Sequence, residues 1–148
     1  MNNFSDGGSI RIAFMCVQNA GRSQMSMAFA EREREQRGLE DHTIILTGGT
    51  NPADHVHDGV VEVMHEVGLD LSDRTPRKIT PKELQSCEYI ATMGCSTLDV
   101  GGVSEDIEVR DWALDDPDGE PLKQVREIRD EIERMVKTLF DEIEQTHI

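Results

Sequence analysis

The sequence predicts a parallel α/β sandwich. Short apolar segments typical of buried strands alternate with amphipathic segments typical of helices. The length of 148 residues suits one domain with a single core, and no internal repeat or linker divides it. We therefore expect a disordered leader at residues 1–9, followed by one domain at residues 10–148.

The first two elements are a strand and a helix. Residues 10–15 form a nearly continuous apolar run, as expected for a strand buried on both faces of a parallel sheet. Residues 16–22 form a loop. From Ser23 the apolar residues recur at helical spacing, and Gly38 ends the predicted helix.

The middle of the chain repeats this alternation. Residues 43–47 predict a second strand, which two glycines close. The apolar face of residues 60–67 predicts a helix that Gly68 ends. Residues 80–83 (TPKE) have the form of a capping box with proline at the first helical position.

Two further strands and a long helix complete the alternation. Residues 89–93 predict the third strand, and a loop at residues 94–105 follows it. Residues 107–109 predict a short fourth strand that leads into residues 111–117. The last helix has the most regular apolar spacing, at Leu122, Val125, Ile128, Ile132, Met135, Leu139 and Ile143.

The charge of the chain excludes some functions. Fifteen Lys and Arg residues oppose thirty Asp and Glu residues, which gives a net charge of −15. A basic face for a nucleic-acid backbone is therefore not expected. Only four of the basic residues are lysine. An acidic, lysine-poor chain is typical of a halophilic source, because concentrated salt screens its self-repulsion.

The sequence also predicts a cytoplasmic protein. No apolar run approaches the ~20 residues of a membrane span, and the polar residues 1–8 do not form a signal peptide. The odd number of cysteines, Cys16, Cys87 and Cys95, indicates free thiols rather than a disulfide framework.

The main chemical feature is a Cys-x5-Arg loop between the first strand and its helix. Such a loop turns backbone N–H groups inward as a cradle for an anion, here formed by Val17, Gln18, Asn19, Ala20, Gly21 and Arg22. Asn19 and Gly21 tolerate the unusual backbone angles that a tight cradle needs. The planar guanidinium of Arg22 can donate hydrogen bonds to two oxygens of a tetrahedral oxyanion. The positive potential of this loop also favours a thiolate at Cys16, ready for in-line attack on phosphorus or arsenic.

The spacing alone would also fit a small buried cysteine and an unrelated surface arginine. The strand before the loop and the amphipathic helix after it favour the cradle.

Asp116 is the candidate proton donor. It follows the fourth strand, at the edge of the sheet where strand ends place a ligand crevice, and Pro117 fixes the chain beside it. The neighbouring Asp115 is the less favoured choice. The structural alternative is a surface turn in an acidic protein.

Cys95 is a second thiol of interest. It follows the third strand at the same edge as Cys16, where it could attack a Cys16 adduct and form a disulfide. The alternative is an inert loop residue. Cys87 precedes that strand at the opposite end and is interpreted as structural.

The remaining candidates are interpreted as structural. His55, His57 and His65 have no third ligand at a zinc-like spacing, so we expect surface or capping histidines, no metal and no cofactor. Trp112 and Tyr89 are expected to pack in the core.

Four segments carry a family resemblance: residues 16–25 (CVQNAGRSQM), 49–52 (GTNP), 92–95 (TMGC) and 111–117 (DWALDDP). Together they resemble the arsenate reductases built on the low-molecular-weight tyrosine phosphatase fold, over roughly residues 9–145. The resemblance implies a three-layer sandwich with a four-stranded parallel sheet flanked by helices.

The resemblance also implies roles. Cys16 would be the nucleophile, Asp116 the acid, and Asn19 and Ser23 would hold the cradle and hydrogen-bond the thiolate. Cys95 would displace arsenite by forming a disulfide with Cys16. In the family a third cysteine then passes the disulfide to thioredoxin.

The chain departs from the family at two places. No cysteine follows Cys95, so thioredoxin or another thiol would reduce the disulfide directly, unless the chain is not a reductase. Gln18 and Gly21 stand where relatives often have glycine and cysteine, which bears on the shape of the loop.

Three functions follow from these features. The first is reduction of arsenate to arsenite. The second is hydrolysis of phosphomonoesters, as in a protein tyrosine phosphatase, through a phosphocysteine. The third is a passive sensor of phosphate or arsenate. A phosphotyrosine slot needs aromatic walls, and the chain has one Trp and one Tyr, neither in residues 48–57 nor just after Pro117, which favours the reductase.

Overall fold

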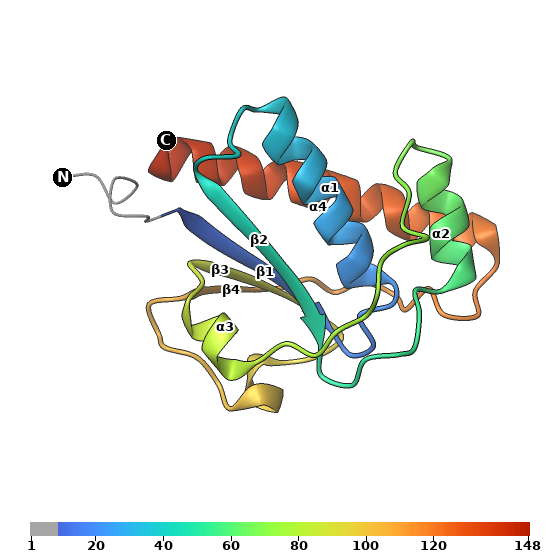
Figure 1. The fold of residues 1–148 in the computed structure, drawn as a ribbon, viewed down its shortest axis with the longest axis horizontal. Helices are drawn as coiled ribbons and strands as arrows, with labels where there is room; N and C mark the ends of the chain where they lie inside the picture. The colour runs from blue at the N-terminus through green and yellow to red at the C-terminus, as the bar shows by residue number, and fades with distance from the viewer. Residues whose placement is uncertain (1–8) are drawn as a thin grey trace.

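A computed structural model describes residues 9–148 of the chain (Figure 1). The predicted leader lies outside these residues except for Ser9. The helices and strands, in chain order, are β1 (Ile10–Cys16), α1 (Arg22–Gln36), β2 (Thr43–Gly49), α2 (Asp58–His65), α3 (Pro81–Gln85), β3 (Tyr89–Met93), the 3-10 helix η2 (Thr97–Val100), β4 (Glu108–Asp111) and α4 (Leu122–His147).

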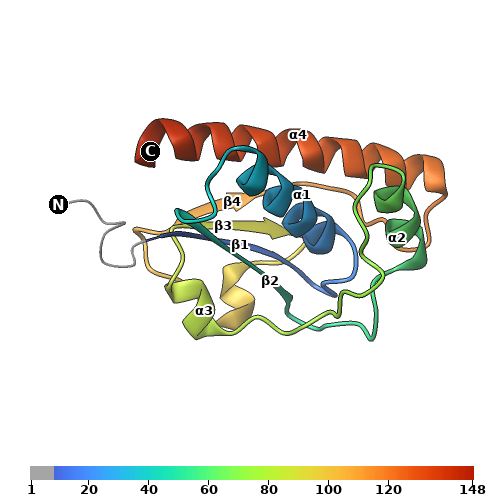
Figure 2. The same cartoon turned by 45° about the horizontal axis from the view of Figure 1, so that its top comes forward.

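The four strands form one parallel sheet in the order β2-β1-β3-β4. Figure 2 shows α1 and α4 on one face of this sheet and α3 on the other, so the predicted three-layer α/β sandwich is confirmed. After β1 the chain first adds β2 on one side and later β3 on the other. The carboxyl ends of β1 and β3 therefore form the switch point where sheets of this kind bind ligands.

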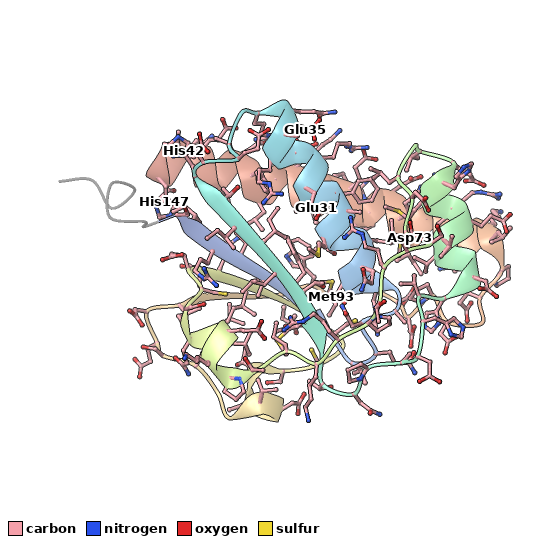
Figure 3. The ribbon with its side chains drawn as sticks, in the orientation of Figure 1. Glu31, Glu35, His42, Asp73, Met93 and His147 are labelled. Carbon is pink, nitrogen blue, oxygen red and sulfur yellow. The ribbon has the colours of Figure 1, made fainter. Side chains whose placement is uncertain are left out.

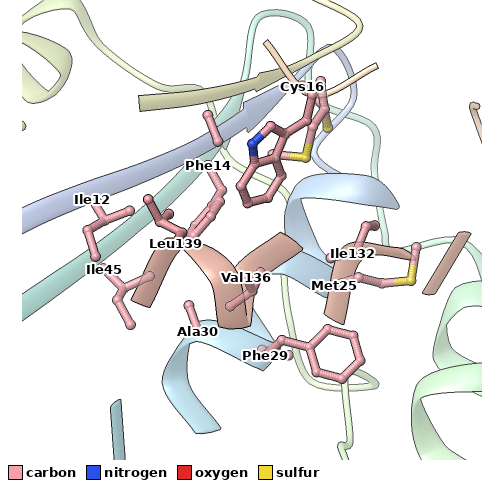
Figure 4. Close-up of a cluster of buried hydrophobic side chains, with 14 of the residues drawn as sticks. Ile12, Phe14, Cys16, Met25, Phe29, Ala30, Ile45, Ile132, Val136 and Leu139 are labelled. Carbon is pink, nitrogen blue, oxygen red and sulfur yellow. The ribbon is translucent and has the colours of Figure 1, made fainter. Parts of the chain in front are cut away.

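Side chains of β1 alternate between two apolar cores. Ile12, Phe14 and Cys16 face the larger core under α1 and α4, where they share one side of the strand in Figure 4. Ala13 and Met15 face a smaller core that α3 covers. The last residue of β1, Cys16, therefore lies over the larger core at the carboxyl edge of the sheet.

Two strands differ in length from the prediction. β2 continues through both glycines, because Gly48 and Gly49 pair with Met15 and Cys16 of β1. β4 begins at Glu108 and includes Asp111, which pairs with Thr92 of β3. The extra residues carry β2 to the level of Cys16 and β4 to the level of Met15.

The last helix was predicted well, with one shift in its buried face. Val136 and Phe140 are fully buried in α4, whereas Met135 is only partly buried. Arg37, at the end of α1, reaches across to Asp141 and Glu144 of α4 at 2.9 and 2.7 Å. Among residues 9–148, no helix combines the length and the hydropathy needed to cross a bilayer.

Candidate active site

The end of β1 and the start of α1 form the floor of a pocket of about 310 Å³. Three separate segments bring the candidate residues together there: the loop after β1, the turn after β3 and the segment after β4. The lining residues are Cys16, Val17, Gln18, Gly21, Arg22, His57, Gly94 and Asp116.

The carbonyl groups of the loop are held on the side away from the pocket. Four of them accept hydrogen bonds from N–H groups of the segment that joins β2 to α2. The donor and acceptor pairs are Thr50 to Cys16 (3.1 Å), Asn51 to Val17 (2.8 Å), Ala53 to Gln18 (2.9 Å) and His57 to Ala20 (2.9 Å). Because successive carbonyls point outward, the N–H groups of the same peptides are turned inward.

These inward N–H groups are available to a ligand. Within residues 9–148, the N–H groups of Gln18 and Gly21 donate to no protein acceptor. They lie beside the N-terminus of α1, whose dipole adds positive potential. The loop thus has the donor arrangement of an oxyanion cradle.

Asn19 fixes the shape of this cradle. It is fully buried and has a φ of +52°, the left-handed conformation predicted for a tight loop. Its Nδ2 donates to Ser23 Oγ at 2.7 Å and to Thr47 Oγ1 at 3.0 Å. Its Oδ1 accepts from Gln24 Nε2 and from the Arg77 N–H at 3.1 and 3.0 Å. Both ends of the side chain are therefore held by the protein.

Gly21 has unusual backbone angles, as predicted, although they are not left-handed. Its φ is −139° and its ψ is −91°, outside both the helical and the extended regions. A Cβ at this position would lie 2.8 Å from Pro117 Cγ, so the loop needs a small residue where the segment after β4 packs on it.

Cys16 lies at the base of the pocket with 2% of its surface exposed. Its Sγ is 2.8 Å from Ser23 Oγ and accepts the Asn19 N–H at 3.2 Å. Because Ser23 Oγ already accepts from Asn19 Nδ2, its own proton is free to point at the sulfur. The sulfur therefore has two polar neighbours at the base of the pocket.

Arg22 is positioned by the turn after β3 and by the segment after β4. Its guanidinium donates to the Leu114 carbonyl at 3.0 Å and lies 3.8 Å from Asp116 Oδ2. A Cβ on Gly94 would come within 2.8–3.1 Å of three guanidinium atoms, and Gly94 has a φ of +77°. Only glycine can adopt this positive φ without strain and also leave room for the guanidinium.

Asp116 is at the mouth of the pocket, with 59% of its side chain exposed. Its Oδ1 accepts the Asp118 N–H at 3.0 Å, which orients the carboxyl group. Asp115 instead lines a separate hollow beside α4. The structure therefore places Asp116, not Asp115, beside the candidate nucleophile.

Cys95 lies next to the pocket but does not line it. Met93, labelled in Figure 3, ends β3 and pairs with Cys16, and Cys95 is two residues further on. Burial raises the pKa of the Cys95 thiol to about 11, and negative charge at Cys16 and Asp99 adds to the rise. Cys95 thus follows, by two residues, the strand residue that pairs with Cys16, and neither thiol is in a disulfide.

Cys87 lies at the other end of β3 in the smaller core. Its Sγ donates to the Glu83 carbonyl at 3.3 Å, and burial raises its pKa to about 11. These contacts agree with its interpretation as structural. Trp112 is likewise buried, with its ring 5.8 Å from that of Phe14.

The sequence reasoning missed His57. It precedes α2 and lines the pocket, and its Nδ1 lies 3.7 Å from Asp118 Oδ1. The motif GTNP at residues 49–52 was the available signal, since it opens the segment that holds the loop. No group of three or more His, Cys, Asp or Glu residues within 9–148 is arranged to hold a metal.

Comparison with known proteins places this geometry in a family. The low molecular weight phosphotyrosine protein phosphatase family matches residues 11–147. The chain belongs to this family. Residues 11–147 include all of the sheet except Ile10, the loop after β1 and α4.

Several relatives in the family are named as reductases. A Halobacterium salinarum protein named "Putative arsenate reductase" is 64% identical over 93% of this chain and 96% of its own length. This relative fits the halophilic source that the composition predicts. A Synechocystis protein named glutaredoxin arsenate reductase is 30% identical over 90% of this chain and 98% of its own length.

A solved structure agrees with these relatives. A thioredoxin-dependent arsenate reductase of Corynebacterium glutamicum superposes with a TM-score of 0.77 at 28% identity. The superposition covers 97% of this chain and 68% of the other.

Proposed function

We propose that this protein reduces arsenate to arsenite with Cys16 as the nucleophile. The free N–H groups of the loop and the Arg22 guanidinium would bind arsenate above Cys16 Sγ. The thiolate forms a bond to arsenic, and one arsenate oxygen departs. Asp116, at the mouth of the pocket, supplies the proton that lets this oxygen leave as water.

The second step transfers two electrons. Cys95 Sγ attacks Cys16 Sγ, and the sulfur–arsenic bond breaks with its electron pair going to arsenic. Arsenic is thereby reduced from As(V) to As(III) and leaves as arsenite, while the two thiols become a Cys16–Cys95 disulfide. An external thiol of the thioredoxin or glutaredoxin class then reduces the disulfide, as in the reducing cytoplasm.

The observation that carries this proposal is the presence of a second thiol beside the oxyanion cradle. Ester hydrolysis needs only Cys16, Arg22 and Asp116, so it gives Cys95 no role. In addition, no Phe, Tyr or Trp is among the residues that line the pocket in the described part of the chain. A small inorganic oxyanion needs no aromatic walls, whereas a phosphotyrosine ring does.

The test is a paired assay in molar salt. The purified protein is given arsenate with thioredoxin and, separately, an aryl phosphate. We expect arsenite from the first assay, its loss in Cys16→Ser and Cys95→Ser, and no loss in Cys87→Ser. Cys95→Ser should spare any aryl phosphate hydrolysis, which Cys16→Ser abolishes. Equal loss of both activities in Cys95→Ser, or arsenite formation that survives it, would contradict the role given to Cys95.

A further inference from the structure

The chain has three cysteines, and the fold keeps one of them out of reach of the other two. Cys87 and Cys95 lie beyond opposite ends of β3, which alone spans about 13 Å at roughly 3.3 Å per residue. A disulfide requires Cα atoms within about 7 Å. Cys16 pairs with Met93 at the far end of β3 and is equally remote from Cys87. While β3 is intact, Cys87 cannot take over a Cys16–Cys95 disulfide.

We propose that the external thiol attacks Cys95 Sγ, not Cys16 Sγ, and that Cys16 is the leaving group. The inference rests on the proposed function, because it concerns the disulfide formed there. The reductant thiolate forms a bond to Cys95 Sγ, and the Cys16–Cys95 bond breaks with its electrons going to Cys16. A second thiol of the reductant then displaces Cys95, which leaves the reductant oxidised and the enzyme with two thiols.

Access favours attack at Cys95. Cys16 lies on the floor of a pocket of about 310 Å³, with 2% of its surface exposed. A thiol carried on a protein surface would have to enter this pocket past Asp116 at its mouth. Cys95 is half-buried at the edge of the smaller core, and the helical turn η2 begins two residues later. Leu98 in this turn is 80% exposed, so this side of the molecule is open.

The leaving group favours the same direction. A disulfide sulfur is displaced fastest when the departing thiolate is the more stable one. When Cys16 is the leaving group, its sulfur can accept hydrogen bonds from the Asn19 N–H and the Ser23 hydroxyl, which lie 3.2 and 2.8 Å away. Departing Cys95 would return to a site where burial raises its thiol pKa to about 11. The cradle that activates Cys16 for attack therefore also makes it the better leaving group.

The test maps the mixed disulfide. The full chain with Cys87→Ser is used, because serine can keep the hydrogen bond to the Glu83 carbonyl and leaves only the two reacting thiols. One portion is oxidised by arsenate without reductant and another by diamide. Each is reacted with glutathione and, separately, with a thioredoxin whose second active-site cysteine is replaced by serine. Free thiols are then alkylated, and peptide masses locate the adduct.

We expect both thiol probes on Cys95 and the alkyl group on Cys16. A probe on Cys16 would overturn the inference, and so would a disulfide that resists both probes. If the adduct forms only with glutathione, the direction stands and the physiological reductant is a small thiol.

Failure of the proposed function has a separate signature. In that case arsenate gives no disulfide while diamide does, and the diamide portion still shows which sulfur is attacked. If neither treatment forms the disulfide, both proposals fail.

Discussion

At the scale of single residues, the site depends on groups that are held in place by contacts outside the pocket. Asn19 contributes no chemistry of its own, yet its side chain joins the loop, α1, β2 and Arg77. Because Asn19 Nδ2 donates to the Ser23 oxygen, the hydroxyl proton of Ser23 remains available to Cys16 Sγ. The chemistry proposed for Cys16 therefore needs buried amide and hydroxyl groups as much as the thiol.

Gly94→Ala should weaken oxyanion binding. The new Cβ would lie within 2.8–3.1 Å of the Arg22 guanidinium and displace it. Since charge-assisted hydrogen bonds contribute about 1.5–3 kcal/mol, the Kd for phosphate should rise about 10- to 100-fold in titration calorimetry. Gly68→Ala is the matched control, because Gly68 also has a positive φ of +83° but has nothing within 4 Å of its Cβ position. Both variants should lose stability; equal loss of phosphate affinity in both would refute this role for Gly94.

Asp116→Asn should slow arsenite formation about 10²- to 10⁴-fold, the usual contribution of a positioned proton donor. Phosphate binding should persist, since the amide still fits at the mouth of the pocket. Asp115→Asn provides the control, because Asp115 lines a different hollow. Steady-state rates for the two variants decide between the neighbours, and a fully active Asp116→Asn enzyme would remove Asp116 from the mechanism.

At the scale of elements, the sequence predicted the strands and helices well and the support of the site poorly. The apolar runs of β1 and β3 identify buried strands because both faces of a parallel sheet are covered. The loop after β1 was recognisable because cysteine and arginine flank it at a fixed spacing. The segment at residues 50–57 supports that loop through backbone N–H groups, so beyond the GTNP motif at its start its side chains do not indicate this role. His57 reaches the pocket for the same reason, since its place follows from a backbone hydrogen bond to Ala20.

The position of Cys95 after β3 predicts a pH dependence for the second step. Burial raises the pKa of Cys95 to about 11, so at neutral pH the thiol form dominates. Raising the pH increases the thiolate fraction, and disulfide formation should accelerate about tenfold per pH unit below the pKa. Quenched single-turnover assays of arsenite between pH 6 and 9 measure this slope. Formation of the Cys16–arsenic bond should not show this pH slope, and the Cys95→Ser enzyme, which stops after that step, tests this. An arsenite release rate that does not change with pH would contradict the prediction.

At the scale of the whole molecule, excess negative charge decides how the protein responds to salt. Thirty Asp and Glu side chains face only fifteen Lys and Arg side chains, so repulsion outweighs attraction. Pairs such as Arg37 with Asp141 and Glu144 join α1 to α4 within this acidic surface. Salt screens both kinds of interaction, and the net effect follows the larger one.

The melting temperature should therefore rise as KCl increases from 0.1 to 2 M. Over this range the screening length falls from about 10 Å to below about 3 Å. Each kcal/mol gained should raise the Tm by about 3–4 °C in a domain of this size. Differential scanning calorimetry measures the shift, and sucrose at equal osmolality controls for solvent exclusion. A Tm that falls with KCl would mean that the ion pairs dominate.

The backbone hydrogen bonds between residues 50–57 and the loop after β1 shape the anion-binding site without taking part in the reaction. A stretch of backbone that carries no reacting atom sets how far apart the anion-facing amides lie. Variation along this stretch would retune the preference among oxyanions of different bond length while leaving sulfur chemistry intact. A combinatorial library confined to those positions is accordingly the natural starting point for redesigning selectivity.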